Sequence, residues 1–250
     1  MNTLLALHQK VIIVTGALGK VGYAAVRLFL ERGAIVAAND WTEAAGHEGM
    51  TELLRRYGED RLLFVQGNAG DEAHVAALFA AISRRFGRLD GTFHNAYLQN
   101  RKPVDQYSLE EWNRLIHGTL GSAFLVCKHA IPLLRESGGG SIVNTSSVLG
   151  VKPRAGEGGY GTAKAGINFL TQVIAAENAS YGIRANVIVP GDIKLPAPVS
   201  AAKAEELKKK IWLGRSAVPE EICELAAFLL SDASSYMTGS LIPIDGGFQL

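Results

Sequence analysis

The stretch "VIIVTGALGKVG", residues 11–22, decides the fold class of this chain. Its first four residues form a continuous apolar run, which is typical of a strand covered on both faces of a sheet. Glycines follow at Gly16, Gly19 and Gly22, before a segment with the apolar spacing of a helix. A strand, a glycine-rich turn and a helix in this order predict a turn that binds the pyrophosphate of a dinucleotide.

The glycines of this turn are not in the usual spacing, because Lys20 stands where the middle glycine is common. We expect Gly16 to permit the tight turn, Gly22 to let the helix approach the strand, and Gly19 to supply backbone freedom one position early. A P-loop is excluded, since Val21 rather than Ser or Thr follows the lysine. The cofactor-binding residues predicted in the turn are Gly16, Leu18, Gly19, Lys20 and Val21.

Asp40 follows the next apolar run and indicates which dinucleotide binds. A carboxylate at this place accepts hydrogen bonds from a ribose diol and repels a 2′-phosphate. The next residue is Trp41 rather than an arginine, so NAD is favoured over NADP. We expect Lys20 to reach the cofactor pyrophosphate or to point outward beside it, and this lysine keeps NADP open as the less favoured cofactor.

Apolar runs and helical segments alternate along the rest of the chain. The further runs are "IVAA" (35–38), "LLFV" (62–65), "GTFHN" (91–95), "SIVN" (141–144), "RANVIV" (184–189) and "LIPI" (241–244). Helical spacing is found near 20–32, 72–86, 109–136, 161–181 and 219–231. This alternation predicts an α/β fold, a Rossmann-like doubly wound parallel sheet of about seven strands with helices on both faces. Because no repeat or linker divides the chain, residues 1–250 are expected to form one dinucleotide-binding catalytic domain.

The composition of the 250 residues narrows the partners and the compartment. A net charge of +1, with no basic stripe beyond the lysines at 208–210, gives no reason to expect a nucleic-acid partner. No apolar run approaches the roughly 20 residues that span a bilayer, so no membrane partner is expected. Cys127 and Cys223 cannot form a disulfide framework or a metal cluster, which predicts buried thiols in the cytoplasm and no metal site.

A second motif, "YGTAK" at residues 160–164, predicts the chemistry. Tyr160 and Lys164 are four residues apart, so they share one face of a helix. Ser147 ends the preceding strand, at the sheet edge where ligands of such folds bind. A free phenol titrates near pH ~10. We expect the ammonium of Lys164 and the positive nicotinamide of the cofactor to favour the phenolate of Tyr160 and so to lower its pKa toward the range of a general base.

Taken together, these motifs resemble the short-chain dehydrogenase/reductase family over nearly the whole chain. The resemblance rests on the glycine turn, Asp40, "HNA" (94–96), Ser147 with Tyr160 and Lys164, "PGDI" (190–193) and the tail at 214–247. It implies hydride transfer between a nicotinamide and a carbinol or carbonyl carbon. Tyr160 would exchange the hydroxyl proton, Ser147 would hydrogen-bond the substrate oxygen, and Lys164 would also hold the nicotinamide ribose.

The resemblance implies further cofactor contacts and an oligomer. Asn68 and Ala69 would meet the adenine, where the asparagine carbonyl can accept a hydrogen bond from the amine, and Asn95 belongs to an Asn-Ala-Gly element. The residues expected to flank the nicotinamide are Pro190, Gly191 and Ile193. A homotetramer or homodimer is expected, with the helices at 109–136 and 161–181 paired across an interface.

Four departures from the family pattern bear on activity. Lys20 occupies a glycine position, and Tyr97 replaces a glycine, adding bulk near the cofactor or at the mouth of the substrate pocket. Leu195 replaces a threonine that contacts the carboxamide. Thr119 replaces the asparagine that helps to hold a water behind the lysine, which predicts a slower proton relay. These changes support an alternative function, a nucleotide-binding module with little or no catalysis.

The intact serine, tyrosine and lysine favour an NAD-dependent oxidoreductase that acts on a small or medium secondary alcohol or carbonyl compound, such as a sugar, hydroxy acid or steroid. In the loop "VKPRAGEGG" (151–159), Lys152 or Arg154 is a candidate contact for an anionic substrate, although solvated loop charges are the commoner explanation. The candidate pocket walls are His94, Tyr97 and Trp212.

Overall fold

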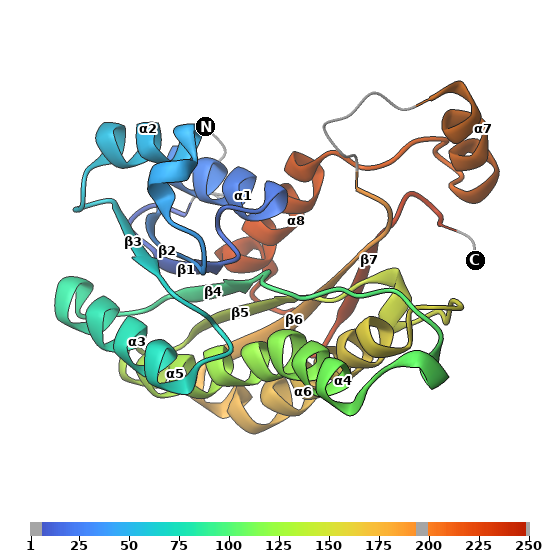
Figure 1. Cartoon of the computed structure of the whole chain (residues 1–250). Coiled ribbons are helices and arrows are strands. Elements are labelled where there is room, and N and C mark those ends of the chain that lie inside the picture. The colour runs from blue at the N-terminus through green and yellow to red at the C-terminus, as the bar shows by residue number, and fades with distance from the viewer. Residues whose placement is uncertain (1–6, 194–199, 249–250) are drawn as a thin grey trace.

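The computed structural model describes residues 7–193 and 200–248, and it contains a seven-stranded parallel sheet with helices on both faces (Figure 1). The strands lie in the order β3-β2-β1-β4-β5-β6-β7. They are β1 (Val11–Thr15), β2 (Ile35–Asp40), β3 (Leu62–Gln66), β4 (Gly91–His94), β5 (Gly140–Thr145), β6 (Ile183–Pro190) and β7 (Leu241–Ile244). The Rossmann-like doubly wound sheet expected from the sequence is confirmed.

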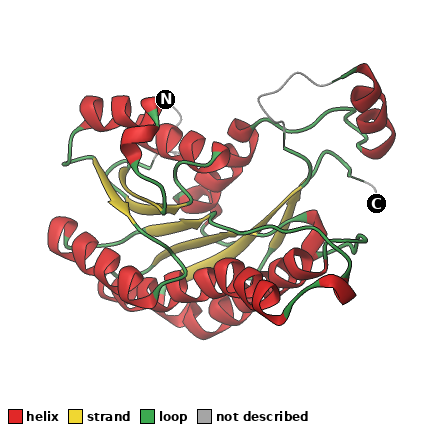
Figure 2. Cartoon of the chain, in the orientation of Figure 1, coloured by secondary structure: helices red, strands yellow, loops and turns green. Residues whose placement is uncertain are grey.

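Helices form a layer on each face of the sheet (Figure 2). One layer contains α1 (Lys20–Glu31), α2 (Glu48–Tyr57) and α8 (Pro219–Leu230). The other contains α3 (Glu72–Phe86), α5 (Ser122–Glu136) and α6 (Gly158–Asn178), with α4 (Leu109–Ile116) packed on α6. The short helix α7 (Ala201–Lys210) lies away from both layers (Figure 1).

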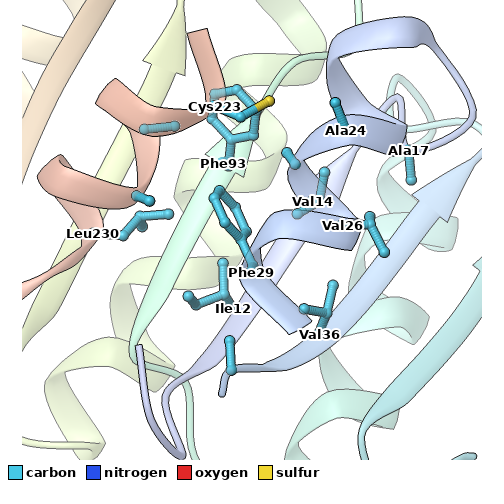
Figure 3. Packing of buried hydrophobic residues seen from close by; sticks show 14 of the residues in the cluster. Ile12, Val14, Ala17, Ala24, Val26, Phe29, Val36, Phe93, Cys223 and Leu230 are labelled. Carbon is cyan, nitrogen blue, oxygen red and sulfur yellow. The ribbon is translucent and has the colours of Figure 1, made fainter. Parts of the chain in front are cut away.

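The first four residues of β1 are apolar, and the whole strand is buried between the two helix layers. Ile12 and Val14 pack with Phe29 of α1 in the core under α1 and α8 (Figure 3). Val11 and Ile13 belong to the second core, under α3 and α5. Each such apolar side chain stabilises the fold by roughly 1.5–3 kcal/mol through burial. The central position of β1 therefore anchors the glycine turn that follows it.

Capping side chains and a glycine mark where helices α3 and α4 begin or end. Asp71 accepts two hydrogen bonds from backbone N–H groups at the start of α3, and Gly87, with φ of 69°, ends that helix. Ser108 and Glu111 form a reciprocal capping box at the start of α4. Within the described ranges, no helix is long and apolar enough to cross a membrane.

The helices of the structure differ from the sequence prediction in two places. The sequence pattern does not predict α2, because its buried side chains are limited to Met50 and Leu53 and its apolar stripe is narrow. The helix expected over 109–136 is divided into α4 and α5 by a π-helical turn at His117–Gly121. Such a turn locally widens the helix and commonly marks a functional site. Here it carries Thr119, one of the departures from the family pattern.

Candidate active site

The carboxyl ends of the strands open into a cleft made of two adjoining pockets. The first, about 480 Å³, is lined by the ends of β2, β3 and β4, and we call it the β2 pocket. The second, about 630 Å³, is lined by the segments after β5 and β6, and we call it the β5 pocket. The strand order reverses between β1 and β4, which is where ligands of doubly wound sheets bind.

Every cofactor and catalytic residue named above as a prediction lines this cleft. The β2 pocket alone contains Gly16, Asp40, Asn68 and Ala69. The β5 pocket alone contains Lys20, Val21, Ser147, Tyr160, Lys164, Pro190, Gly191 and Ile193. Both pockets contain Leu18, Gly19 and Asn95. Leu195 lies outside the described residues.

Two close backbone approaches shape the glycine turn. Gly16 has φ of 64°, and a Cβ at this residue would lie 3.0 Å from Cα of Ala96. A Cβ at Gly22 would collide with the carbonyl oxygen of Gly16, so only glycine lets α1 begin this close to β1. Gly19 has φ of −68° and ψ of 162°, which any residue adopts. The expectation that Gly19 supplies special backbone freedom is therefore wrong, because the left-handed conformation is taken by Gly16.

Asp40 ties the end of β2 to the glycine turn. Its Oδ2 accepts a hydrogen bond from the Leu18 N–H at 2.9 Å, and its Oδ1 accepts one from the Thr42 N–H at 3.0 Å. Across the β2 pocket, Oδ1 of Asn68 accepts a hydrogen bond from the Gly70 N–H at 2.9 Å. The carboxylate and the amide are thus held by the backbone beside them, and both are part of the pocket wall.

Lys20 is the first residue of α1 and presents an exposed side chain to the β5 pocket. The first turn of α1 contains no acidic residue. The ammonium of Lys20 and the amino terminus of α1 therefore attract an anion to the same place.

Ser147, Tyr160 and Lys164 meet where β5 faces α6. Ser147 follows β5, and its Oγ accepts a hydrogen bond from the Leu149 N–H at 3.1 Å. Tyr160 and Lys164 lie one turn apart on α6, and both side chains are buried. Nζ of Lys164 donates to the carbonyl oxygen of Thr145 at 2.7 Å. The structure thus brings together the three side chains that the sequence predicts as catalytic.

Burial opposes a charge on both members of the tyrosine and lysine pair. It lowers the pKa of Lys164 to about 7. Burial also raises the pKa of Tyr160. The neighbouring Tyr97 raises this pKa further, whereas a hydrogen bond from the Ser147 hydroxyl lowers it. The lowering of the Tyr160 pKa that Lys164 and the nicotinamide together are expected to cause is not found for the side chains alone, because desolvation is the largest influence on this pKa.

Tyr97 covers this pair from the side of the cleft. Its ring packs edge-on against the ring of Tyr160, with the centroids 5.7 Å apart. Nζ of Lys164 lies 5.2 Å from the centroid of the Tyr97 ring. The side chain is half exposed and lines both pockets, so the tyrosine that replaces the family glycine adds its bulk where the two pockets join.

Thr119 is engaged by the loop after β4. Its hydroxyl accepts a hydrogen bond from the Leu98 N–H and donates one to the Leu98 carbonyl oxygen, both at 3.0 Å. A threonine hydroxyl has one donor, and Leu98 uses it. The Thr119 side chain is fully buried in this arrangement and has no donor left for a water behind Lys164.

Two of the expected pocket walls lie elsewhere. His94 is fully buried behind the cleft, with Nδ1 2.9 Å from Oγ1 of Thr15 and Nε2 3.3 Å from Oγ of Ser122. Burial, and then the nearby Lys164, lower the pKa of His94 to about 3. Trp212 is 78% exposed and belongs to neither pocket. The prediction for His94 and Trp212 used only their residue types. Where each ring points depends on packing against other segments, which the sequence pattern does not show.

The loop after Ser147 contributes one charged side chain to the cleft. Nζ of Lys152 donates to the Phe248 carbonyl oxygen at 2.9 Å, which ties the loop to the end of the chain. Arg154 lines the β5 pocket. Glu157, which the sequence pattern does not single out, accepts a hydrogen bond from this arginine.

The cleft therefore contains both the glycine turn that follows β1 and the phenol of Tyr160 on α6, a group that can exchange a proton. Rossmann-type oxidoreductases are the class of protein built in this way. A family model described as Enoyl-(Acyl carrier protein) reductase matches residues 16–249. The chain belongs to the short-chain dehydrogenase/reductase family.

Similar proteins agree with this assignment. The chain is 38% identical to cis-4-hydroxycyclohexanecarboxylate dehydrogenase of Sinomonas cyclohexanicum, over 97% of this chain and 98% of that protein. It is 34% identical to 2,5-dichloro-2,5-cyclohexadiene-1,4-diol dehydrogenase of Sphingobium indicum, over 98% of each protein. A crystal structure of levodione reductase matches with a TM-score of 0.88 and 30% identity, over 96% of this chain and 97% of that one. The protein is thus an oxidoreductase that uses a nicotinamide cofactor and acts on a hydroxyl or carbonyl group.

Proposed function

We propose that this protein is an NAD-dependent dehydrogenase of a cyclic secondary alcohol, and that Tyr160 exchanges the hydroxyl proton. The observation that carries the proposal is the position of Ser147, Tyr160 and Lys164 on one wall of a cleft whose other end holds Asp40. Relatives named for a hydroxycyclohexanecarboxylate and a cyclohexadiene diol support a cyclic substrate. Reduction of the corresponding ketone uses the same groups in reverse.

The residues of the cleft fit the cofactor from end to end. Asn68 and Ala69 would hold the adenine, Asp40 the ribose diol, and Lys20 with the amino terminus of α1 the pyrophosphate. The residues that would surround the nicotinamide all line the β5 pocket: Asn95, Tyr160, Lys164, Pro190, Gly191 and Ile193. When bound, the nicotinamide supplies the carbon that accepts or donates the hydride. The Asp40 carboxylate favours NAD over NADP because it repels a 2′-phosphate.

Three side chains would exchange the proton and bind the substrate oxygen. Tyr160 takes the hydroxyl proton during oxidation and returns it during reduction. The Ser147 hydroxyl accepts from the Leu149 N–H and is within hydrogen-bond reach of the Tyr160 hydroxyl, so its own proton would turn from Tyr160 to the substrate oxygen when the substrate binds. Lys164, with a pKa of about 7, gains or loses its proton close to neutral pH, and its charged form favours the phenolate of Tyr160. Since Thr119 has no donor to offer a water behind Lys164, we expect proton exchange with solvent to be slow.

We also propose that residues 1–250 act as one catalytic domain within a homotetramer or homodimer. Phe124 on α5 and Phe169 on α6 expose apolar rings on helices that are expected to pair with those of a second copy. Cys127 and Cys223 are free and buried, which fits the reducing environment of the cytoplasm.

The test is an assay of cofactor reduction with purified protein. NAD or NADP would be combined with cyclohexanol, cyclohexane-1,4-diol and the cis and trans 4-hydroxycyclohexanecarboxylates. We expect turnover with NAD for at least one of them, and a loss of about 10³-fold in kcat for Tyr160→Phe. The same variant should bind NAD in calorimetry as the wild type does. If both proteins bind NAD and neither turns over any alcohol or ketone, the protein is the nucleotide-binding module described above.

A further inference from the structure

We propose that Arg154 determines substrate specificity by binding a carboxylate, so that the substrate is a hydroxylated carboxylic acid in its ionised form. This inference rests on the dehydrogenase function proposed above, and it adds the charge of the substrate. It is carried by the way in which the protein holds Arg154 at the wall of the β5 pocket.

A buried acid orients the arginine. Oε1 of Glu157 accepts a hydrogen bond from Nη2 of Arg154 at 2.7 Å, and Oε2 accepts one from Nε2 of Gln99 at 3.2 Å. The Glu157 side chain is only 2% exposed, whereas that of Arg154 is 36% exposed. Arg154 and Gln99 line the β5 pocket, and Glu157 lies behind them. A charge-assisted bond to a buried partner keeps the guanidinium in one place.

The charges of this cluster do not cancel. Nε of Arg101 also lies 3.5 Å from Oε1 of Glu157, so two guanidinium groups share one carboxylate. Among the described residues, Glu157 is the one side chain to which Arg154 donates. A guanidinium has five N–H donors in a planar fork, and most of those of Arg154 remain for a ligand. A second carboxylate is the group that matches both this fork and the remaining positive charge.

The other cations of the β5 pocket have different contacts. Lys20 lies at the glycine turn, and Nζ of Lys164 donates to the Thr145 carbonyl oxygen. The acidic lining residue, Asp192, accepts a hydrogen bond from the Ser216 hydroxyl at 2.5 Å. Arg154 is therefore the cation that this wall presents to the substrate.

The backbone holds the cluster as a unit beside the catalytic helix. The Lys102 N–H donates to the Gly156 carbonyl oxygen at 3.0 Å, and Lys102 forms a parallel bridge with Glu157. Glu157 is also the residue that precedes α6, the helix that carries Tyr160. The proposed carboxylate anchor and the proton-exchanging tyrosine are thus fixed to the same element, which is the rigidity that discrimination between substrates needs.

The first experiment compares acid and ester substrates of the full-length enzyme with NAD. It uses cis- and trans-4-hydroxycyclohexanecarboxylate and their uncharged methyl esters. We expect Arg154→Gln to lower the acid-to-ester ratio of kcat/KM about 10- to 100-fold, mainly through the KM of the acid. Arg154→Lys should be intermediate, because it keeps the charge without the fork. Arg101→Gln is the matched control, because Arg101 also contacts Glu157 but does not line the pocket. This variant should keep the wild-type acid-to-ester ratio of kcat/KM.

The second experiment measures binding without turnover. Calorimetry with cyclohexanecarboxylate, which has no hydroxyl to oxidise, should detect binding to the wild type that Arg154→Gln weakens by a similar factor. Cyclohexanecarboxamide, an uncharged probe, should not discriminate between the two proteins.

The outcomes separate the two proposals. An unchanged acid-to-ester ratio in Arg154→Gln, or an equal loss for acid and ester, would overturn the carboxylate anchor. If neither the acids nor the esters are turned over, the dehydrogenase proposal fails for these substrates. The calorimetric comparison then decides the anchor alone: binding of cyclohexanecarboxylate that depends on Arg154 supports it, and equal binding by both proteins overturns it.

Discussion

The two pockets of the cleft are built in opposite ways. In the β2 pocket, the Asp40 carboxylate is satisfied by two backbone N–H groups, and the glycine turn is a close steric fit. In the β5 pocket, Lys164 is buried, and both its pKa and that of Tyr160 are shifted toward the uncharged forms. The proposed cofactor end therefore stabilises the folded protein, whereas the proposed catalytic end destabilises it, as is common at functional sites.

Lys164→Met tests this contrast most strongly. We expect kcat to fall about 10³-fold, while the free energy of unfolding at neutral pH increases. The pKa of Lys164 is about 7 in the folded protein against 10.5 for a free lysine. The unfolded chain therefore binds more protons between these values, and wild-type stability rises with pH across this interval.

The gain in stability from methionine should accordingly be complete below pH ~7 and decrease as the pH rises toward ~10. Urea unfolding of both proteins at several pH values checks this. A difference in unfolding free energy that does not change with pH would contradict the buried charge.

Gly22→Ala tests the steric fit at the other end. The added methyl group would collide with the Gly16 carbonyl oxygen, so α1 must shift away from β1. We expect a loss of about 2–3 kcal/mol in the free energy of unfolding, together with weaker NAD binding. Gly46→Ala is the matched control, because a Cβ at Gly46 meets no atom within 4 Å. Equal stability of the two variants, measured by urea unfolding, would show that the turn has room to relax.

Asp40→Ala tests which of two roles the carboxylate has: repelling the 2′-phosphate of NADP, or holding the backbone of the glycine turn. Removing the carboxylate should lower the preference for NAD over NADP about 10- to 30-fold, as the ratio of the two Kd values. Glu43→Ala, at an exposed acid in the same pocket, serves as the control and should change this ratio little. An equal loss of affinity for both cofactors would mean that Asp40 acts only by holding Leu18 and Thr42.

Lys20→Gly has the smallest expected effect. Its exposed ammonium should contribute about a two- to threefold gain in NAD affinity at low salt, and less at high salt because such charges are screened. Titrations of NAD at several salt concentrations measure this, with Lys209→Gln on α7 as the control at an exposed lysine away from the cleft. If affinity and salt dependence both stay at the wild-type values, the side chain points away from the pyrophosphate.

Much of the fold could be predicted because its signals are local. The apolar run of β1 and the spacing of Gly16 and Gly22 lie within one short segment, and Tyr160 and Lys164 are neighbours on one helix. Helix α2 was not predicted because few of its side chains are buried, so its apolar pattern is weak. The cluster around Arg154 could not be recognised, because Gln99 and Arg101 lie far from Glu157 in the sequence and come beside it only in the folded protein.

The sequence by itself determined the strand, the glycine turn and the residue types of the proposed catalytic site, since periodicity and steric demands act over a few residues. Only the tertiary structure decided how those side chains are solvated. Desolvation depends on segments that approach from elsewhere: the ring of Tyr97 over Lys164, the Leu98 backbone on Thr119, and the acid behind Arg154. The protonation of the catalytic pair and the charge offered to the substrate therefore follow from packing rather than from residue type.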